Sequence, residues 1–274
     1  MPEIVLETAS DPRVVEYRDL RDSELIRARG HFVAEGRLVV QRLIEDERYS
    51  IRSLLLSSTT WEALRPWLSR LDPGVPIYVC PVAHFLEIAG FHVHRGCLAL
   101  VERPPLASAG ELLARAQLVV VLEDVANPDN VGGVFRSAAA FGADAVLLSP
   151  GCCDPFYRKA VRTSMAATLR VPFSRIAEWP AGLGILRARG FALVALTPRE
   201  PAQPLDDFVH GNGLERIALL VGSEAAGLTP EADAMADCRV RIPIRPEVDS
   251  LNLSVAAGIV LSRLSRLTNL PDLA

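Results

Sequence analysis

Short apolar runs alternate with amphipathic segments along the chain, and this alternation predicts strands and helices in turn. Charged, helix-compatible sequence at 10–28 comes before the alternation begins. In the first hundred residues the predicted strands are 31–34, 53–56, 75–79 and 97–101. The predicted helices there are 35–47, 60–71, with a bend at Pro66, and 82–89. The pattern indicates a small α/β sandwich of about 100 residues.

A proline-rich break at 103–110 separates this region from a second α/β series. Its predicted strands are continuous apolar runs, at 118–122, 145–148, 192–196, 217–221 and 239–242. Its predicted helices are 131–141, 156–169, 182–189 and 251–267, the last with Ser250 as the expected N-cap. Such strands are buried on both faces, so we expect a parallel sheet covered by helices on each side. The chain is therefore divided into a domain at 1–103, a linker at 104–115 and a second domain at 116–274.

Composition and charge narrow the classes of protein that fit. The 274 residues are 50% hydrophobic and 23% charged, as in globular proteins. No apolar run approaches the roughly 20 residues of a membrane-spanning helix and no secretory signal is visible, so we expect a cytoplasmic protein without a membrane partner. The 5 cysteines are odd in number and lack CxxC spacing, so no metal site is expected. With a net charge of −4, any surface for nucleic acid must be a local patch.

The common nucleotide-binding signatures are missing from the sequence. No GxGxxG follows a predicted strand and no GxxxxGK[ST] is present, so neither a Rossmann site nor a P-loop is indicated. Instead, three polar segments follow predicted strands of the second domain. Ligands of α/β sheets bind beyond the carboxyl ends of strands, so these segments are the candidates for a functional site.

The first segment joins a turn to the start of a helix. Asn127 opens the turn, and its amide can cap the helix that follows. Gly132 and Gly133 permit close backbone approach. The spacing of Asn130, Gly133 and Arg136, three residues each, predicts that they share one helix face. A capped helix with a surface arginine would give the same pattern.

The second and third segments are similar in kind. In the second, a buried strand runs into a turn in which Gly222 is followed by the carboxylate of Glu224. In the third, Ser250 and Asn252 place polar groups at a helix N-terminus, where free N–H groups can also meet an anion. A plain loop and simple helix capping are the alternative interpretations of each segment taken alone.

Together and in this order, the three segments resemble the three motifs of the SpoU/TrmH family of RNA ribose 2′-O-methyltransferases, in the SPOUT superfamily. The resemblance covers residues 118–267, and residues 32–36 with the helix after them look like the small RNA substrate-binding domain of that family. It implies a deep trefoil knot in the second domain and S-adenosyl-L-methionine as cofactor. It also implies a homodimer whose active sites share residues across the interface.

The resemblance assigns roles to residues position by position. The catalytic motif residues it implies are Arg136, Asn130, Glu224, Ser250 and Asn252. The residues whose backbone would hold the cofactor are Gly222, Ile242 and Leu251. A basic helix at 154–169 would contact RNA through Arg158, Lys159 and Arg162. The charged loop at 245–249 departs from the glycine-containing loop of many relatives, which puts the geometry of the cofactor loop in question.

The implied chemistry is methyl transfer from a sulfonium to a ribose 2′-hydroxyl, which requires alignment of the reactants. Arg136 either takes the proton, which is costly for a guanidinium, or stays charged and anchors the phosphate beside the target ribose. Large-subunit (23S) rRNA is the favoured substrate because of the separate N-terminal domain. The alternatives are a tRNA 2′-O-methyltransferase and a non-catalytic RNA-binding assembly factor.

Overall fold

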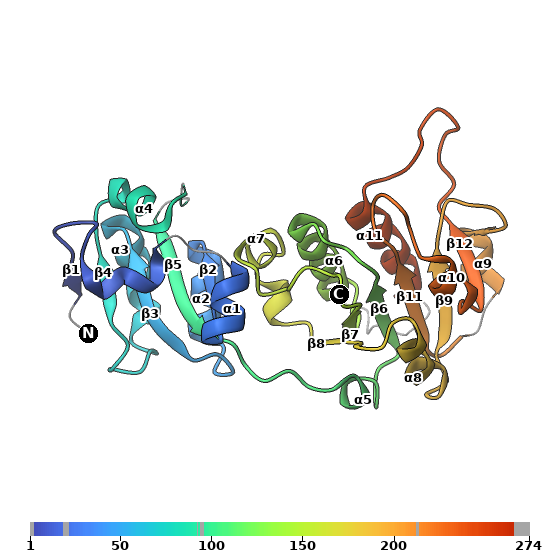
Figure 1. Ribbon diagram of the computed structural model, residues 1–274, viewed down its shortest axis with the longest axis horizontal. Helices are drawn as coiled ribbons and strands as arrows, with labels where there is room; N and C mark the ends of the chain where they lie inside the picture. Colours follow the sequence, from blue (N-terminus) through green and yellow to red (C-terminus); the bar gives the residue numbers. More distant parts are fainter. Residues whose placement is uncertain (1–2, 19–21, 92, 94–95, 212–213, 266–274) are drawn as a thin grey trace. The chain divides into compact units, whose positions relative to one another are not determined.

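The computed structural model describes residues 3–18, 22–91, 93, 96–211 and 214–265 (Figure 1). The chain forms two compact units. The first comprises Met1–Pro105 together with Asp154–Ala166, and the second comprises Leu106–Cys153 and Ala167–Ala274. The chain therefore passes from one unit to the other three times, after Pro105, after Cys153 and after Ala166. No helix among the described residues is long and apolar enough to cross a membrane.

The first unit is built on a mixed five-stranded sheet of order β1-β4-β3-β5-β2. β5 is antiparallel to β2 and β3, whereas β4 is parallel to β1 and β3. Its strands are β1 (Ile4–Val5), β2 (His31–Glu35), β3 (Ile51–Leu56), β4 (Ile77–Val79) and β5 (Cys97–Glu102). Its helices are η1 (Pro12–Tyr17), α1 (Asp22–Arg29), α2 (Arg37–Glu45), α3 (Ser58–Leu68), α4 (Val82–Ala89) and α7 (Arg158–Thr163).

Both faces of this sheet are covered. Val33, Leu55 and Leu100 lie in one buried cluster with side chains of η1, α1 and α4. Alternate residues of the same strands face the other way, toward α2 and α3. The phenol of Tyr17 is buried within the first layer, where it donates to the Ser53 carbonyl (2.9 Å) and accepts from the Leu100 N–H (3.2 Å). The α/β sandwich predicted for this region is thus present.

The second unit contains a seven-stranded, wholly parallel sheet of order β10-β12-β9-β11-β6-β7-β8. Its strands are β6 (Leu118–Leu122), β7 (Ala145–Leu148), β8 (Phe173–Arg175), β9 (Ala192–Leu196), β10 (Gln203–Pro204), β11 (Ile217–Val221) and β12 (Cys238–Arg241). Its helices are α5 (Ala109–Leu112), α6 (Pro128–Ala140), η2 (Ala167–Leu169), η3 (Ala181–Leu183), α8 (Gly184–Arg187), α9 (Leu205–Gly211), α10 (Pro230–Ala234) and α11 (Leu253–Leu264).

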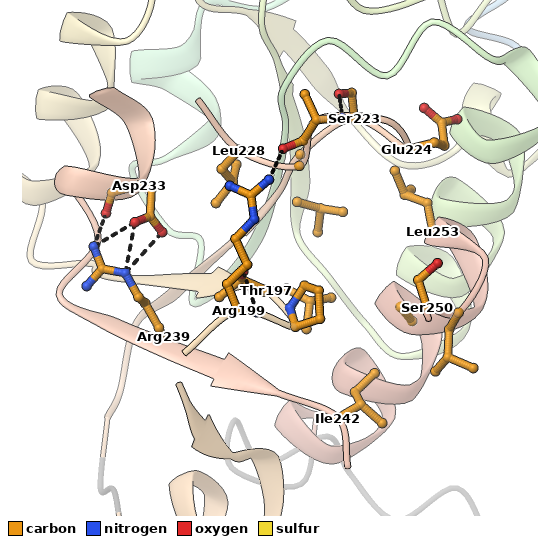
Figure 2. Close-up of a pocket in the computed structure, with 18 of the residues that line it drawn as sticks. Thr197, Arg199, Ser223, Glu224, Leu228, Asp233, Arg239, Ile242, Ser250 and Leu253 are labelled. Atoms are coloured by element: carbon orange, nitrogen blue, oxygen red, sulfur yellow. Dashed lines mark hydrogen bonds and ion pairs between the residues drawn. The ribbon is translucent and has the colours of Figure 1, made fainter. Parts of the chain in front are cut away.

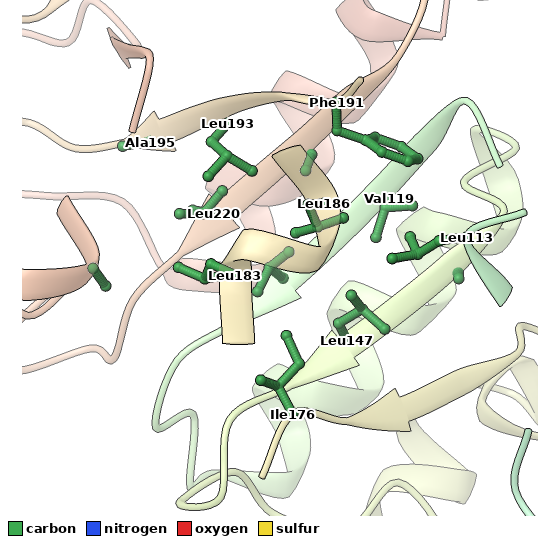
Figure 3. Close-up of a cluster of buried hydrophobic side chains, with 14 of the residues drawn as sticks. Leu113, Val119, Leu147, Ile176, Leu183, Leu186, Phe191, Leu193, Ala195 and Leu220 are labelled. Carbon is green, nitrogen blue, oxygen red and sulfur yellow. The ribbon is translucent and has the colours of Figure 1, made fainter. Parts of the chain in front are cut away.

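One face of the parallel sheet carries the apolar cluster drawn in Figure 3. Val119, Leu147 and Leu220 project from three strands and meet Leu183 and Leu186 of η3 and α8. The opposite face is covered by α6 and α11, whose inward side chains are fully buried. The parallel sheet covered on both faces is confirmed.

Several elements differ from the sequence prediction. The helix expected at 156–169 is only Arg158–Thr163 long, because Met165 and Ala166 adopt left-handed φ angles of 53° and 67°. The strands β8 and β10 were not expected, since runs of two or three residues carry no clear pattern. The helix expected at 251–267 begins at Leu253, and the part of it beyond residue 265 lies outside the described residues.

Candidate functional site

The parallel sheet brings the three polar segments to one edge. β6, β11, β9 and β12 are successive neighbours, and all run in the same direction. The chain segments that follow them therefore leave the sheet side by side. Segments more than one hundred residues apart in sequence meet at these carboxyl ends, which is where α/β proteins bind ligands.

The first segment folds as a capped helix that starts earlier than predicted. The Asn127 side chain accepts from the N–H of Asp129 (2.9 Å), and Pro128 occupies the first turn, where its missing N–H costs nothing. The helix α6 therefore begins at Pro128 instead of residue 131, and Asn130 lies inside its first turn, buried.

A chain of side-chain hydrogen bonds connects all three segments. The Asn130 amide donates to the Glu224 carboxylate through Nδ2 and accepts from Asn252 Nδ2 through Oδ1 (3.0 Å). Asn252 in turn accepts at Oδ1 from the N–H of Ser254 (3.0 Å) at the start of α11. In both amides Nδ2 donates and Oδ1 accepts, so these hydrogen bonds fix the orientation of each amide.

Asn252, and not Ser250, is therefore the N-cap of α11. Its oxygen accepts from two backbone N–H groups of the first turn, which satisfies donors that a helix start leaves open. Ser250 lies two residues before the cap and lines the pocket described below. The expected N-cap assignment was wrong by two residues.

The second segment is a tight loop that only glycine permits at its base. A Cβ on Gly222 would lie 2.0 Å from the carbonyl carbon of Gly227 and 2.1 Å from the Leu228 nitrogen. Ser223 and Gly227 close the loop with two backbone hydrogen bonds of 3.1 and 2.9 Å. The close approach explains the glycine, and the loop holds Glu224 at its exposed tip.

The second and third segments border a pocket of about 960 Å³ (Figure 2), whereas Asn130 of the first segment is not among its lining residues. Ile242, Ser250 and Leu253 lie on one side of it, with Glu224 near the last. The lining includes the predicted residues Gly222, Glu224, Ile242, Ser250, Leu251 and Asn252. The charged stretch 245–249 is not part of the lining, so the loop between β12 and α11 contributes only its two ends and Ile244.

Charged side chains occupy the other side of the pocket. Arg239 of β12 binds the Asp233 carboxylate through Nε (2.9 Å) and the Asp233 carbonyl through Nη2 (2.8 Å). The hydrogen bond to that carboxylate raises the pKa of the Arg239 guanidinium. Arg199, just after β9, donates to the Ala226 carbonyl (3.0 Å) and so connects the β9 loop to the Glu224 loop.

Sequence reasoning missed these charged residues for different reasons. Arg199 follows a predicted strand, so the rule that led to the three segments could also have found it. Asp233 and Arg239 carry no such signal, because their ion pair depends on α10, a helix of 5 residues that was not predicted. Buried Glu123 was missed as well. Its carboxylate accepts from the N–H (2.8 Å) and hydroxyl (2.7 Å) of Thr229, which anchors the chain after the Glu224 loop.

Arg136 does not join this group. It is exposed on α6 and is not among the residues that line the pocket, whereas Asn130 is buried. The expectation that both share one helix face was wrong. A step of three residues falls about 60° short of a full turn, so two steps place the side chains about 120° apart.

The predicted RNA-binding residues lie in the first unit. α7 packs against β2, and Arg158 and Arg162 both contact the carboxylate of Glu35. Lys159 is exposed on the same short helix. Among the residues that the structure describes, no cluster of three His, Cys, Asp or Glu side chains could hold a metal ion.

Comparisons with known proteins identify the family of the chain. The model of the SpoU rRNA Methylase family matches residues 117–262. An uncharacterized tRNA/rRNA methyltransferase of Mycobacterium bovis is 40% identical over 260 residues, which cover 93% of this chain and 89% of the relative.

Solved structures give the same result for the fold. The AdoMet-bound rRNA methyltransferase of Sinorhizobium meliloti is 25% identical, with a TM-score of 0.79 and coverage of 96% of this chain and 97% of its own. The SpoU methyltransferase AviRb of Streptomyces viridochromogenes, in complex with AdoMet, has a TM-score of 0.75 at 22% identity and covers 93% and 98%. The family model spans more than half of the chain and the mycobacterial relative nearly all of it, so the chain belongs to the SpoU rRNA methylase family.

Proposed function

We propose that the chain is an S-adenosylmethionine-dependent RNA methyltransferase that modifies the ribose 2′-hydroxyl, with large-subunit (23S) rRNA as its substrate. The observation that carries the proposal is the hydrogen-bonded chain from Glu224 through Asn130 to Asn252. It joins all three family motifs, and its two outer members, Glu224 and Asn252, line one pocket.

The pocket fits a cofactor of this kind. Its volume of about 960 Å³ is within the range of small-molecule sites. Its wall at Gly222 is bare backbone, because a Cβ there would overlap the loop. Backbone groups around Gly222, Ile242 and Leu251 would hold the cofactor, as the family resemblance implies. When bound, the cofactor supplies an electrophilic methyl group on a sulfonium.

The residues of the protein contribute to the reaction by orienting the 2′-hydroxyl and removing its proton. The Asn130 amide holds the Glu224 carboxylate in place, while Glu224 itself is exposed at the pocket mouth. We infer that this carboxylate either accepts the proton of the 2′-hydroxyl or orients the group that does. A hydroxyl held in line with the methyl group gains reactivity from alignment alone.

Arg136 enters this scheme through a second copy of the chain. It is exposed and outside the pocket of its own unit, so it is available to the pocket of a partner in a homodimer. The α11 face next to α6 supports such a dimer, because Val255 and Ile259 are exposed there beside Gly133. Arg136 would then approach the ribose or its flanking phosphate from the other copy.

Mixing inactive variants tests the shared site. If Arg136 acts across the interface, Arg136→Ala and Glu224→Ala chains are each inactive, but their heterodimer has one complete site. Random reassortment should then restore about a quarter of the native rate. If the mixture stays inactive although heterodimers are shown to form, Arg136 does not serve the partner's pocket.

Two measurements test the function as a whole. Calorimetric titration with S-adenosylmethionine should show binding to the wild-type protein, and mapping of 2′-O-methylation in total RNA with and without the gene should reveal one missing 23S position. Loss of a tRNA position instead would reassign the substrate. No change in any RNA, together with no cofactor binding, would leave only an RNA-binding role.

A further inference from the structure

Glu35 is a carboxylate with no exposure to solvent, at the end of the edge strand β2. Buried carboxylates need charged or hydrogen-bonding partners. Two arginines of α7 pair with Glu35: Arg158 contacts Oε2, and Arg162 lies 3.5 Å from Oε1. All three residues belong to the first unit, although α7 lies in sequence between two strands of the second sheet.

The two arginines differ in what else they contact. The Arg158 guanidinium stacks over the Phe91 ring at 3.5 Å from its centre. The backbone N–H of Arg158 donates to the Asp22 carboxylate (3.0 Å). Only 20% of the Arg158 side chain is exposed, whereas 46% of the Arg162 side chain is. Arg158 is therefore enclosed by its neighbours, and Arg162 keeps much of its surface open to solvent.

The rest of the segment Asp154–Ala166 is held in the same way. Phe156 is buried and stacks on Phe32 of β2, with 4.8 Å between the ring centres. Asp154 pairs with Arg103 at 3.1 Å, so its negative charge is compensated. The segment is a built-in part of the first unit, and its position depends on contacts with β2.

Exposed cations lie on α7 and next to it. Lys159 and Arg162 are exposed on α7, and exposed Arg42 of α2 donates to the carbonyl of Met165 just beyond it. Lys159 is also the only lysine of the chain. A group of cations with its acidic neighbour turned inward suits the phosphates of a nucleic acid.

We propose that Glu35 is a positioning residue for RNA binding. Its carboxylate holds α7 through Arg158, so that Arg162, Lys159 and Arg42 present one phosphate-binding surface. Arg158, which the sequence analysis placed among the RNA contacts, has a structural role in this arrangement. The inference rests on the proposed function, since it takes RNA to be the substrate.

The direction in which one substitution changes RNA affinity separates this role from simple electrostatics. Glu35→Gln removes a negative charge beside two guanidinium groups, so a purely Coulombic view predicts tighter RNA binding. A positioning role predicts weaker RNA binding, because a neutral amide cannot balance the charge of Arg158. The amide N–H groups would also face a guanidinium, which has donors but no acceptor. We expect RNA affinity to fall about tenfold, the loss of one to two charge-assisted contacts.

The experiment measures binding of the full-length protein to 23S rRNA extracted from a strain that lacks the gene. Affinity is determined across a salt series for the wild type, Glu35→Gln, Arg162→Ala and the control Glu62→Gln. Glu62 is an exposed acid of α3 in the same unit, so its substitution makes the same charge change without the buried pair. S-adenosylmethionine binding is measured in parallel for each protein.

The expected result is weaker RNA binding by Glu35→Gln, unchanged or slightly tighter binding by Glu62→Gln, and native cofactor affinity in both. Arg162→Ala, on an exposed position, should fold normally and lower the slope of log affinity against log salt by about 0.7–0.9. If Glu35→Gln fails to fold, Arg158→Lys takes its place, because it keeps the positive charge but loses the planar fork that contacts Glu35. It should also weaken RNA binding, and tighter or equal binding by it overturns the positioning role.

Tighter or equal binding by a folded Glu35→Gln overturns the positioning role. A native salt slope in Arg162→Ala overturns the phosphate surface. If the wild type binds cofactor but no RNA, the proposed function itself is wrong.

Discussion

Gly222→Ala puts the smallest possible side chain where the structure leaves no room for one. The new Cβ would lie 2.0 Å from the Gly227 carbonyl carbon, 2.1 Å from the Leu228 nitrogen and 2.2 Å from the Gly227 oxygen. Carbon atoms are best separated by about 3.5 Å, so this backbone would have to retreat by about 1.5 Å. No flexible side chain can absorb the overlap, because all three atoms belong to the main chain.

The loss of stability follows from the contacts that the displaced backbone would lose. Two backbone hydrogen bonds close the loop between Ser223 and Gly227, and each contributes about 1 kcal/mol to stability. Overpacking adds roughly 1–3 kcal/mol of strain. We expect the free energy of unfolding of the second unit to fall by about 3–5 kcal/mol, which corresponds to a drop in Tm of roughly 6–20 °C.

Cofactor binding should suffer more than the overall fold, because the displaced loop is itself a wall of the pocket. If about 3 kcal/mol of the strain falls on the bound state, S-adenosylmethionine affinity drops on the order of 100-fold. Differential scanning fluorimetry and calorimetric titration with S-adenosylmethionine measure the two effects.

The matched control is Gly184→Ala at the start of α8, where a Cβ meets nothing within 4 Å. It should be neutral or stabilise by up to about 1 kcal/mol. The reasoning is refuted if Gly222→Ala melts as the control does and binds the cofactor with native affinity.

Three further outcomes are expected. Arg136→Ala should abolish most turnover but leave S-adenosylmethionine affinity unchanged, since Arg136 lies outside the pocket. If Arg136 anchors a phosphate, Arg136→Lys should keep a measurable single-turnover rate at neutral pH. If Arg136 takes the proton, the rate of Arg136→Lys should recover only toward pH ~10. Ile259→Arg should shift the protein from dimer to monomer in sedimentation, while Val82→Arg, equally apolar and exposed on α4, should not. Burial raises the pKa of Tyr17, so the contribution of this phenol to stability is complete below its unfolded-state pKa of about 10 and declines at higher pH. Tyr17→Phe should therefore be less stable than the wild type in urea at pH 8. Between pH 8 and 11, however, the variant should lose less stability than the wild type does.

The sequence was informative wherever a pattern is local and long. Runs of five apolar residues, such as Leu118–Leu122 and Ile217–Val221, predicted their strands to the residue. The three motif segments were found because polar residues follow these strands, and the sheet order then brings them together. The trefoil knot that the family resemblance implies stays a prediction.

The sequence was uninformative where the structure depends on backbone angles or on distant partners. The early end of α7 results from left-handed φ angles at Met165 and Ala166, and neither methionine nor alanine predicts such an angle. The hydrogen bond between Asn130 and Asn252 joins residues 122 apart in the sequence. Arg136 was misplaced for a simpler reason, because a spacing of three was treated as a full helical turn.

The division of the first unit into two stretches of sequence bears on how the protein emerges from the ribosome. Met1–Pro105 leaves the ribosome first, but this unit also needs Asp154–Ala166, about 50–60 residues later. At about 5–20 residues per second, several seconds pass before Phe156 can cover Phe32 and Arg158 can meet Glu35. During that interval the nascent chain carries an uncompensated carboxylate and an open edge strand, the kind of surface that invites pairing with other chains. A pause in translation before residue 166 has left the ribosome would prolong this exposure, whereas a pause after it has emerged would give the surface time to close.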